Sequence, residues 1–306
     1  MKKKPVQKKL LREQIQRRVN AVRFVLRLTS KQMVDMEHTI GDLVTYETDE
    51  GPVRALTYGF EVEDKRPLVV NIHGSGFVMG SAAMDDPFMM QFVEKCGVKV
   101  ISIDYPLSPD VMFPTALNQC YALVRYVKKH ADELGIDGER IVLMGHSAGG
   151  NISSSICLLE NNAPTLGLKG LILDYPPTDL SMDPYDKPSP KGCLPPKLCR
   201  IFDAAYCTEE ERTNPLVSPA LSTPDMVKGF PPTLVITAGL DSLAEETERF
   251  KDTLVEAGVD VTFKRFEGAI HGFTIMTEKQ SRGREGLYEM SLAAWQMMVD
   301  FVNERI

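Results

Sequence analysis

Short apolar runs alternate with longer helical segments along most of this chain. The runs have the length and continuity of strands in a sheet, and they lie at residues 67–72, 98–103, 141–144, 168–173, 233–237 and 261–266. The segments between them predict helices near residues 86–96, 115–134, 151–160 and 244–257. Parallel strands joined through helices need right-handed crossovers, so the pattern predicts an α/β fold with a mostly parallel central sheet and helices on both faces.

The two ends of the chain add other elements. Two runs rich in strand-forming residues, around residues 44–60, flank a turn at 49–52. They predict an antiparallel hairpin that opens the sheet. At the other end, Trp295, Met298 and Val302 share one face of a closing helix. Residues 8–27 predict an amphipathic helix whose Lys and Arg residues lie outside its apolar stripe and face solvent. The stripe consists of Leu11, Ile15, Val19, Val22 and Leu26.

The regular alternation breaks at residues 176–232, which hold twelve of the 20 prolines in the chain. This stretch is too long and too often interrupted for a simple connection between two elements. Long ordered loops in compact domains usually act as lids or binding elements. We therefore expect an insertion that lies over a functional site.

Charge is distributed unevenly along the 306 residues. The net charge is −7, but residues 1–31 hold eleven Lys or Arg against the single acid Glu13, which leaves 24 minus 41, or −17, for the remainder. Arginines interrupt every apolar stretch near the N-terminus, so we expect neither a secretion signal nor a membrane span. The six cysteines lack the spacing of a zinc site and fit reduced thiols in a cytoplasmic protein.

The clearest chemical motif follows the apolar run at 141–144. It reads Gly145-His146-Ser147-Ala148-Gly149 and leads directly into a predicted helix. A strand, a sharp turn and a helix in this order form a nucleophile elbow, which holds a serine hydroxyl clear of the backbone. Gly145 and Gly149 stand where a side chain would collide with neighbouring elements. Ser147 is therefore the candidate nucleophile, and the N–H group of Ala148 points where an oxyanion would form.

A second glycine-rich motif, His73-Gly74-Ser75-Gly76-Phe77, follows the run at 67–72. Glycines after a buried strand allow backbone N–H groups to approach a ligand closely. Taken alone, this motif is equally typical of an ordinary glycine-containing turn. With the Ser147 turn also present, the motif predicts the other half of an oxyanion hole.

An elbow serine needs an imidazole to take its proton and a carboxylate to orient that imidazole. Asp241 follows the run at 233–237, and His271 follows the run at 261–266. Both therefore stand at the edge where open α/β sheets form their sites, and the order serine, acid, histidine is that of hydrolases with an elbow. We predict that Ser147, Asp241 and His271 form a catalytic triad.

Besides His271 and His73 of the glycine-rich motif, the chain holds three histidines. His146 is a rival to His271 in principle, but the residue before the nucleophile generally points away from the serine, so we assign it a structural or modulating role. His38 and His130 lie in polar surroundings and receive no role.

Several motifs taken together resemble the hormone-sensitive-lipase-like family of α/β-hydrolases, from about residue 67 to the C-terminus. They are His73-Gly74-Ser75-Gly76-Phe77, Asp104-Tyr105-Pro106-Leu107-Ser108-Pro109-Asp110, Gly145-His146-Ser147-Ala148-Gly149-Gly150-Asn151, Asp241-Ser242-Leu243 and His271-Gly272-Phe273. The resemblance implies the α/β-hydrolase fold and a carboxylesterase that needs no cofactor or metal. It also implies a helical cap, formed by N-terminal helices and a mid-chain insertion.

The resemblance divides the chain into a cap and a catalytic domain. It implies N-terminal cap helices in residues 1–43, a catalytic domain in 44–175 and 233–306, and a cap insertion in 176–232. Carried over motif by motif, the triad is Ser147, Asp241 and His271. The oxyanion hole is formed by the N–H groups of Ser75, Gly76 and Ala148, with His73, Gly74, Gly145 and Gly149 in support.

Three residues depart from the family pattern. The family usually has glycine in place of Ser75, an acid in place of His146 and an aspartate in place of Glu245. None of these changes removes a catalytic group. A Cβ at Ser75 restricts the backbone of an oxyanion-hole residue and narrows the acyl side, so the expected effect is lower activity or smaller substrates.

The resulting hypothesis is a serine carboxylesterase that hydrolyses short- to medium-chain acyl esters, acetyl esters included, through an acyl-enzyme on Ser147. The alternatives are a peptidase or amidase on the same fold, and a non-catalytic small-molecule receptor of that fold. The expected partner is a small ester. We expect no nucleic acid and disfavour a membrane surface, for which the basic N-terminal helix would be the anchor. A homodimer stays open.

Overall fold

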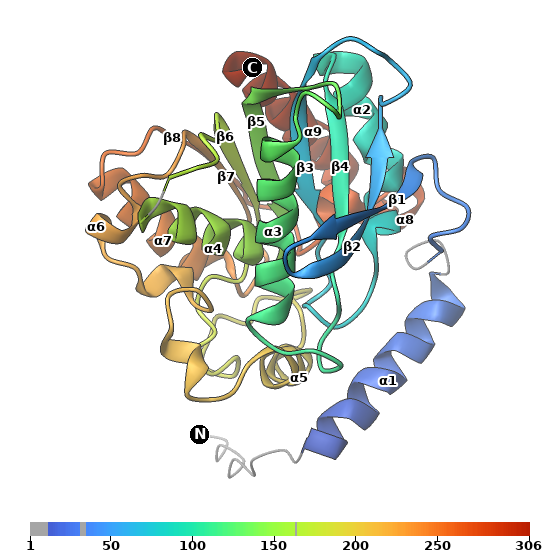
Figure 1. Ribbon diagram of the computed structural model, residues 1–306. Helices are drawn as coiled ribbons and strands as arrows, with labels where there is room; N and C mark the ends of the chain where they lie inside the picture. Colours follow the sequence, from blue (N-terminus) through green and yellow to red (C-terminus); the bar gives the residue numbers. More distant parts are fainter. Residues whose placement is uncertain (1–11, 31–34, 163) are drawn as a thin grey trace, which may run out of the picture.

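The computed structural model describes residues 12–30, 35–162 and 164–306. In these residues one sheet has the strand order β1-β2-β4-β3-β5-β6-β7-β8 (Figure 1). Strands β1 and β2 form the predicted hairpin, β2 is antiparallel to β4, and every later pair is parallel. The strands are β1 Asp42–Thr48, β2 Gly51–Tyr58, β3 Arg66–Ile72, β4 Lys99–Asp104, β5 Ile136–His146, β6 Gly170–Asp174, β7 Thr233–Ala238 and β8 Val261–Phe266.

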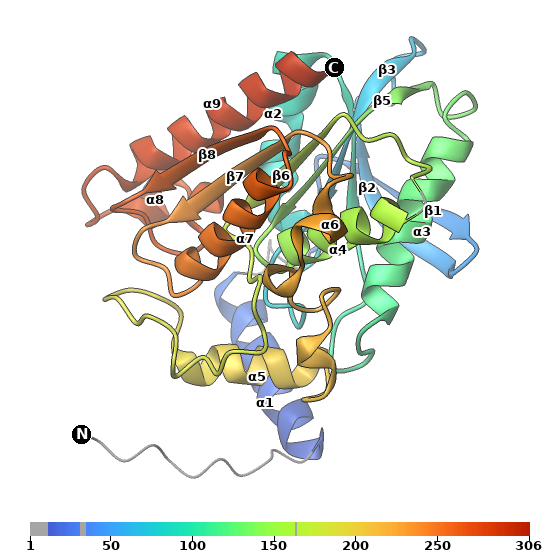
Figure 2. The same ribbon diagram turned by 90° about the vertical axis from the view of Figure 1, so that its left-hand side faces the viewer.

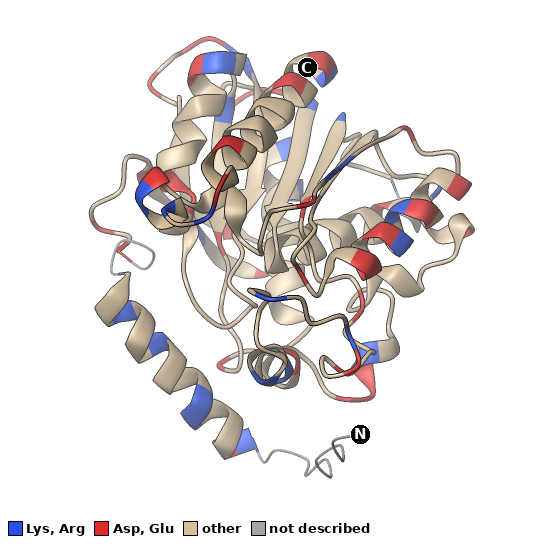
Figure 3. Cartoon of the chain, turned by 180° about the vertical axis from the view of Figure 1, so that it is seen from behind, with Lys and Arg blue, Asp and Glu red and all other residues tan. Residues whose placement is uncertain are grey.

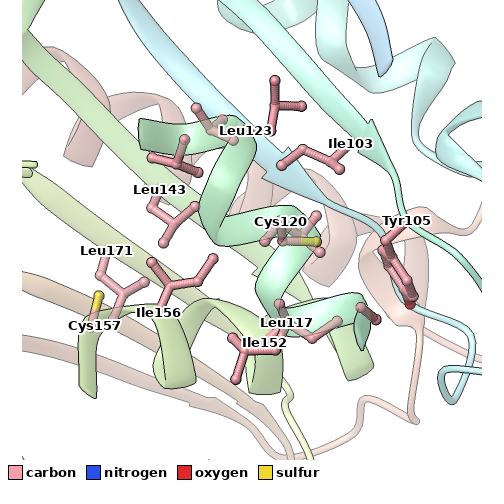
Figure 4. Close-up of a cluster of buried hydrophobic side chains, with 14 of the residues drawn as sticks. Ile103, Tyr105, Leu117, Cys120, Leu123, Leu143, Ile152, Ile156, Cys157 and Leu171 are labelled. Atoms are coloured by element: carbon pink, nitrogen blue, oxygen red, sulfur yellow. The ribbon is translucent and has the colours of Figure 1, made fainter. Parts of the chain in front are cut away.

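Helices cover both faces of this sheet. One face packs against α2 (Asp86–Cys96) and α9 (Leu287–Arg305), and the other against α3 (Thr115–Lys129), α4 (Ala148–Asn162) and α7 (Ala244–Glu256). Successive side chains of each central strand point to opposite faces, so one apolar run supplies both cores. Figure 4 shows the core on the face covered by α3 and α4, where Leu143 and Leu171 of the sheet meet side chains of these two helices.

The observed elements confirm the predicted α/β fold and shift two of its boundaries. Strand β5 begins at Ile136, earlier than the apolar run at 141–144 indicated. Helix α3 ends at Lys129 and not near Gly135. The chain turns there because Ile136 N–H donates to the Ala131 carbonyl at 2.8 Å, and Gly135 takes a positive φ of 61°.

The proline-rich stretch at 176–232 has two parts that pack in different places. Its first part, residues 176–206, carries α5 (Pro196–Tyr206), which lies against α1 (Arg12–Thr29) at one end of the molecule (Figure 2). Its second part includes α6 (Pro224–Val227) and packs on α4 and α7 of the body. The two parts therefore have different neighbours, α1 for the first and the body helices for the second.

Helix α1 packs its apolar stripe on this same region. Ile15 and Val19 are buried with Val78 and with residues of α5, while Val22 and Leu26 are half-buried and Leu11 lies outside the described residues. Arginines are spaced along α1 (Figure 3). The expectation that all of them face solvent is wrong for Arg23, whose guanidinium donates to the Val78 carbonyl at 2.6 Å and the Ser108 carbonyl at 2.9 Å. Its Nη1 also forms an ion pair with Asp110 Oδ2 at 2.6 Å.

Two further observations concern the whole described chain. No helix in the described ranges has the length and apolar character needed to cross a membrane. All six cysteine thiols are free.

Candidate active site

Ser147 stands at the sharp turn between β5 and α4. Its φ of 50° lies in the left-handed region, which a residue with a side chain adopts only where the surroundings impose it. A Cβ at position 145 would collide with the backbone of Gly149, and one at position 149 would collide with the Ile72 carbonyl. Both glycines are therefore required by close approach of backbone to backbone, which fixes the turn that exposes the serine.

The structure brings the three predicted side chains together at the ends of three strands. Ser147 Oγ lies 2.9 Å from His271 Nε2, and His271 Nδ1 lies 2.7 Å from Asp241 Oδ2. Asp241 follows β7 and is held in turn by the N–H group of Leu243, which donates to its other oxygen at 3.2 Å. This chain of contacts allows His271 to take the serine proton while Asp241 fixes the orientation of its ring.

The electrostatics of His271 follow from burial opposed by nearby carboxylates. Burial alone would lower the pKa of His271, because it disfavours the charged imidazolium. The Asp241 charge and hydrogen bond, with a smaller effect from Asp174, outweigh burial, so the pKa of His271 lies above its ordinary value. The ring is accordingly a stronger base than a free imidazole, and it must lose its proton before it can act.

The loop after β3 has an unusual backbone. Ser75, Gly76 and Phe77 all have positive φ angles, of 86°, 62° and 66°. A Cβ at position 76 would run into the ring of Phe202 on α5, so glycine is required at Gly76. Ser75 carries a side chain in a conformation that favours glycine, and its Oγ contacts the Met84 sulfur. The departure at Ser75 therefore stores local strain in the loop.

Three backbone N–H groups are available beside the serine. Among the described residues, those of Ser75, Gly76 and Ala148 donate to no carbonyl or side chain. Ala148 is the first residue of α4, where N–H groups have no acceptor inside the helix and the helix dipole favours negative charge. Unpaired donors at this point are suited to an oxyanion.

Two buried rings hold the loop in place. His73 stacks on Tyr105 with ring centroids 4.3 Å apart, and its Nδ1 lies 3.0 Å from the Gly74 carbonyl oxygen. The Tyr105 hydroxyl donates to the His73 and Gly74 carbonyls at 3.2 and 3.1 Å. The motif at 104–110 contributes to the family resemblance, which implies no role for its tyrosine. The structure shows that Tyr105 supports the loop.

His146 packs toward α9, with its ring centroid 5.8 Å from that of Trp295. Its Nδ1 lies 2.7 Å from Asp174 Oδ2, which also accepts from the Thr274 hydroxyl at 2.6 Å. Both ring and carboxyl are fully buried, and burial raises the pKa of Asp174 despite these two hydrogen bonds. His146 thus lies in a structural pair. The other two histidines have carboxylate neighbours of their own, His38 with Asp35 and His130 with Glu133.

Ser147 and His271 open into a cavity of about 190 Å³. Its walls come from the loop at 74–79, from residues 271–275 after β8, and from the first part of the proline-rich stretch. That stretch contributes Pro177, Lys187, Leu194, Leu198, Cys199, Phe202 and Asp203. A larger hollow of about 540 Å³ lies by α3 and includes His130, but it lies on other elements than the serine and its donors. The chemistry therefore belongs to the smaller, more apolar cavity.

Comparison with known proteins gives consistent results. Residues 69–275 match the family described as alpha/beta hydrolase fold. The chain is 29% identical to Esterase LipI of Mycobacterium tuberculosis over 260 residues, and this match covers 83% of this chain and 81% of that protein. It is 41% identical to hormone-sensitive lipase of Mus musculus over 118 residues, and this match covers 38% of this chain and 15% of the lipase.

The structural comparison extends over more of the chain. A thermostable esterase from Pseudomonas putida has a TM-score of 0.82 and 27% identity, covering 94% of this chain and 90% of that one. Among four curated relatives the match covers between 62% and 81% of the relative's own length. The strand order, the elbow and these similarities agree, and the chain belongs to the hormone-sensitive-lipase-like family of carboxylic ester hydrolases with the alpha/beta hydrolase fold.

Proposed function

We propose that this protein is a serine carboxylesterase that forms an acyl-enzyme on Ser147. The observation that carries the proposal is the contact of Ser147 Oγ with His271 Nε2 beside three N–H groups that have no other acceptor among the described residues. A receptor of the same fold has no need of a serine paired with an oriented base. The names of relatives such as Esterase LipI and the Pseudomonas putida esterase support the same class.

In the proposed mechanism His271 takes the proton of Ser147 as the hydroxyl attacks the ester carbonyl. The N–H groups of Ser75, Gly76 and Ala148 stabilise the negative oxygen of the tetrahedral intermediate. His271 then gives its proton to the departing alcohol, which leaves an acyl group on the serine. A water molecule repeats the attack with the same base, and the acid and free serine are released.

The cavity bears on the size of the substrate. Its volume of about 190 Å³ is below the ~300–1,000 Å³ usual for pockets that hold drug-sized ligands. The Ser75 side chain and the Phe202 ring limit it on the side of the 74–77 loop. We therefore propose short- to medium-chain acyl esters, acetyl esters included, as substrates.

We also propose that α1 and the first part of the proline-rich stretch form a cap over the cavity. Support comes from the packing of Ile15 and Val19 against α5, and from the α5 side chains in the cavity wall. The six free thiols favour a reducing compartment, so we propose a cytoplasmic location.

Covalent labelling with a fluorophosphonate tests the assignment and separates it from a receptor. The wild-type protein and the Ser189→Ala variant, which lacks an exposed serine outside the cavity, should take up one label each, whereas Ser147→Ala should take up none. A panel of nitrophenyl esters of increasing acyl length should then be hydrolysed best at the short end. Labelling without turnover of any ester or amide would favour the receptor, and amide turnover above ester turnover would favour the amidase.

A further inference from the structure

Two charged side chains stand in the otherwise mostly apolar wall of the cavity. Lys187 and Asp203 both come from the first part of the proline-rich stretch, and each is only 8% exposed. Charged groups are seldom buried to this extent unless a partner compensates for the loss of water. The partners of each group therefore show whether it has a purely structural role.

Lys187 has such partners. Its Nζ lies 2.5 Å from Glu246 Oε2 and donates to the Asp179 carbonyl at 2.7 Å. Glu246, on α7, also accepts from the N–H groups of Thr178 and Asp179 at 2.9 and 3.2 Å. This buried pair ties the start of the proline-rich stretch to the body of the enzyme, and it accounts for the lysine without a ligand.

Asp203 differs, because one of its carboxyl oxygens has no partner. Oδ2 is buried without a hydrogen-bond donor in the part of the chain that the structure describes. On α5 the residue shares a helix face with Leu198, Cys199 and Phe202, all of which line the cavity. A buried acceptor that lacks a donor is costly to the protein, and such groups in native structures call for an explanation.

The surroundings of Asp203 are consistent with a carboxyl that lacks a donor. Burial raises its pKa to about 6, although the charge of Lys187 and those of Arg212 and Arg200 act in the opposite direction. Asp183 adds a further unfavourable charge. Above that pH the group is a carboxylate, which is an acceptor only.

We propose that Asp203 is a specificity-determining residue, whose carboxyl accepts a hydrogen bond from a hydroxyl or protonated amine on the substrate ester. This inference rests on the proposed esterase function and names a substrate class for it. A site built to receive a donor rejects an analogue that lacks one far more strongly than an apolar pocket rejects an added hydroxyl, because the polar group of the site is then left unpaired. The enzyme accordingly prefers an ester with a donor to an apolar ester of equal size.

The donor can lie on either part of the ester, and matched pairs of substrates separate the two. Ethyl β-hydroxybutyrate against ethyl isovalerate places the hydroxyl on the acyl part. Hydroxyethyl butyrate against propyl butyrate places it on the alcohol part, and dimethylaminoethyl butyrate against isoamyl butyrate places a cation there. Each pair exchanges a polar group for an apolar one of nearly the same shape, and hydrolysis is followed by titration of the released acid at pH 8.

The wild-type enzyme should show kcat/KM at least tenfold higher for the polar member in one or more pairs. In Asp203→Leu that ratio should fall at least tenfold and turn in favour of the apolar ester. Both members of a pair are measured on one preparation, so partial loss of folded enzyme cancels in the ratio. Asp203→Asn keeps an acceptor oxygen and should retain part of the preference for the hydroxyl ester while losing that for the cationic one.

The matched control is Asp183→Asn, which removes a negative charge from the same stretch. Asp183 pairs with Arg200 at 2.6 Å and does not line the cavity, so this variant should keep the wild-type ratio. A kcat/KM ratio of polar to apolar ester near unity in wild type, or a ratio unchanged in Asp203→Leu, would overturn the inference. If the enzyme is still labelled and active in that case, the proposed function stays intact. Absence of both labelling and ester turnover in wild type would overturn the two together.

Discussion

The two halves of the proposed oxyanion hole are held by different parts of the molecule. The elbow half, around Ser147 and Ala148, is fixed by backbone approaches within the sheet, above all that of Gly149 to the Ile72 carbonyl. The loop half, around Ser75 and Gly76, is held by side chains, namely the Phe202 ring of α5 and the Tyr105 hydroxyl, which follows β4. Both contain positive φ angles, but only the elbow is confined by main chain alone.

This difference separates the part of the site that positions the nucleophile from the part through which the cap can change the rate of the reaction. The nucleophile is positioned by the catalytic body and should be indifferent to changes in the cap. The donors of the loop should respond to changes in α1 and α5, because these helices contact the loop directly. Variants on either side therefore test whether the two halves are independent.

The largest expected effect belongs to the elbow half. Ser147→Ala should lower kcat on the order of 10⁶-fold without loss of folding, because members of a triad act as a unit. Circular dichroism and thermal unfolding serve as the folding control. Turnover within tenfold of the wild type would remove Ser147 from the mechanism.

His271 gives an effect of similar size and a pH signature. Because its pKa is raised and only the neutral ring is a base, kcat/KM should fall as pH drops through a midpoint above the ordinary value of about 6.5. An apolar ester should be used for the profile, since Asp203 also titrates near 6. His271→Ala should abolish both the activity and this pH limb.

His146 supplies the contrast to that result. His146→Ala should leave the limb in place and instead lower stability, because Asp174 would lose its imidazole partner and remain buried. His146→Asn, which can still donate to Asp174, should recover part of the melting temperature. Greater loss of activity in His146→Ala than in His271→Ala would show that the base has been assigned to the wrong ring.

Ser75 tests the loop half at a smaller scale. Ser75→Pro removes the N–H group and cannot adopt the φ of 86°, so it should cost roughly 10²-fold or more in kcat. Ser75→Gly keeps the donor, relieves the side chain at a φ of 86°, and should preserve or raise kcat while admitting bulkier esters. Equal activity of the two variants would mean that this amide does not touch the transition state.

Deletion of residues 1–30 tests the dependence of the loop on the cap. Among the described residues the strands begin at Asp42, so the sheet should stay folded. The apolar surface around Ile201 should be exposed, and the chain-length preference should change more than the chemistry. The rival account is a membrane anchor, examined by sedimentation with anionic liposomes at low and physiological salt. Salt-sensitive binding that disappears with the deletion, together with an unchanged ester profile, would favour the anchor.

The smallest expected effect comes from a single arginine of α1. Arg23→Ala removes the donor to the Val78 carbonyl and should lower kcat several-fold by loosening the loop. Arg18→Ala, on the exposed side of the same helix, changes the charge equally and should leave kcat as it is. Equal effects of the two variants would indicate that net charge on α1, and not the contact with the loop, is responsible.

Much of the fold and the candidate triad could be predicted from the sequence because their signals are local. Apolar runs mark the strands, and chemistry-bearing residues directly after them share one edge of a parallel sheet. The inward turn of Arg23 and the unpartnered carboxyl of Asp203 left no such signal. Each depends on which surfaces meet across the cap, and neither periodicity nor spacing reports contacts between segments that are distant in sequence.

The contact between Gly76 and the Phe202 ring has a consequence for laboratory evolution of this enzyme. Because any side chain at position 76 would enter the space of that ring, the two positions cannot be varied one at a time without collision or a void. A library that enlarges position 76 should carry small residues at 202 in the same clone. Conversely, a cap segment grafted from a relative should bring an aromatic ring to position 202, or the glycine beneath it will face an empty space.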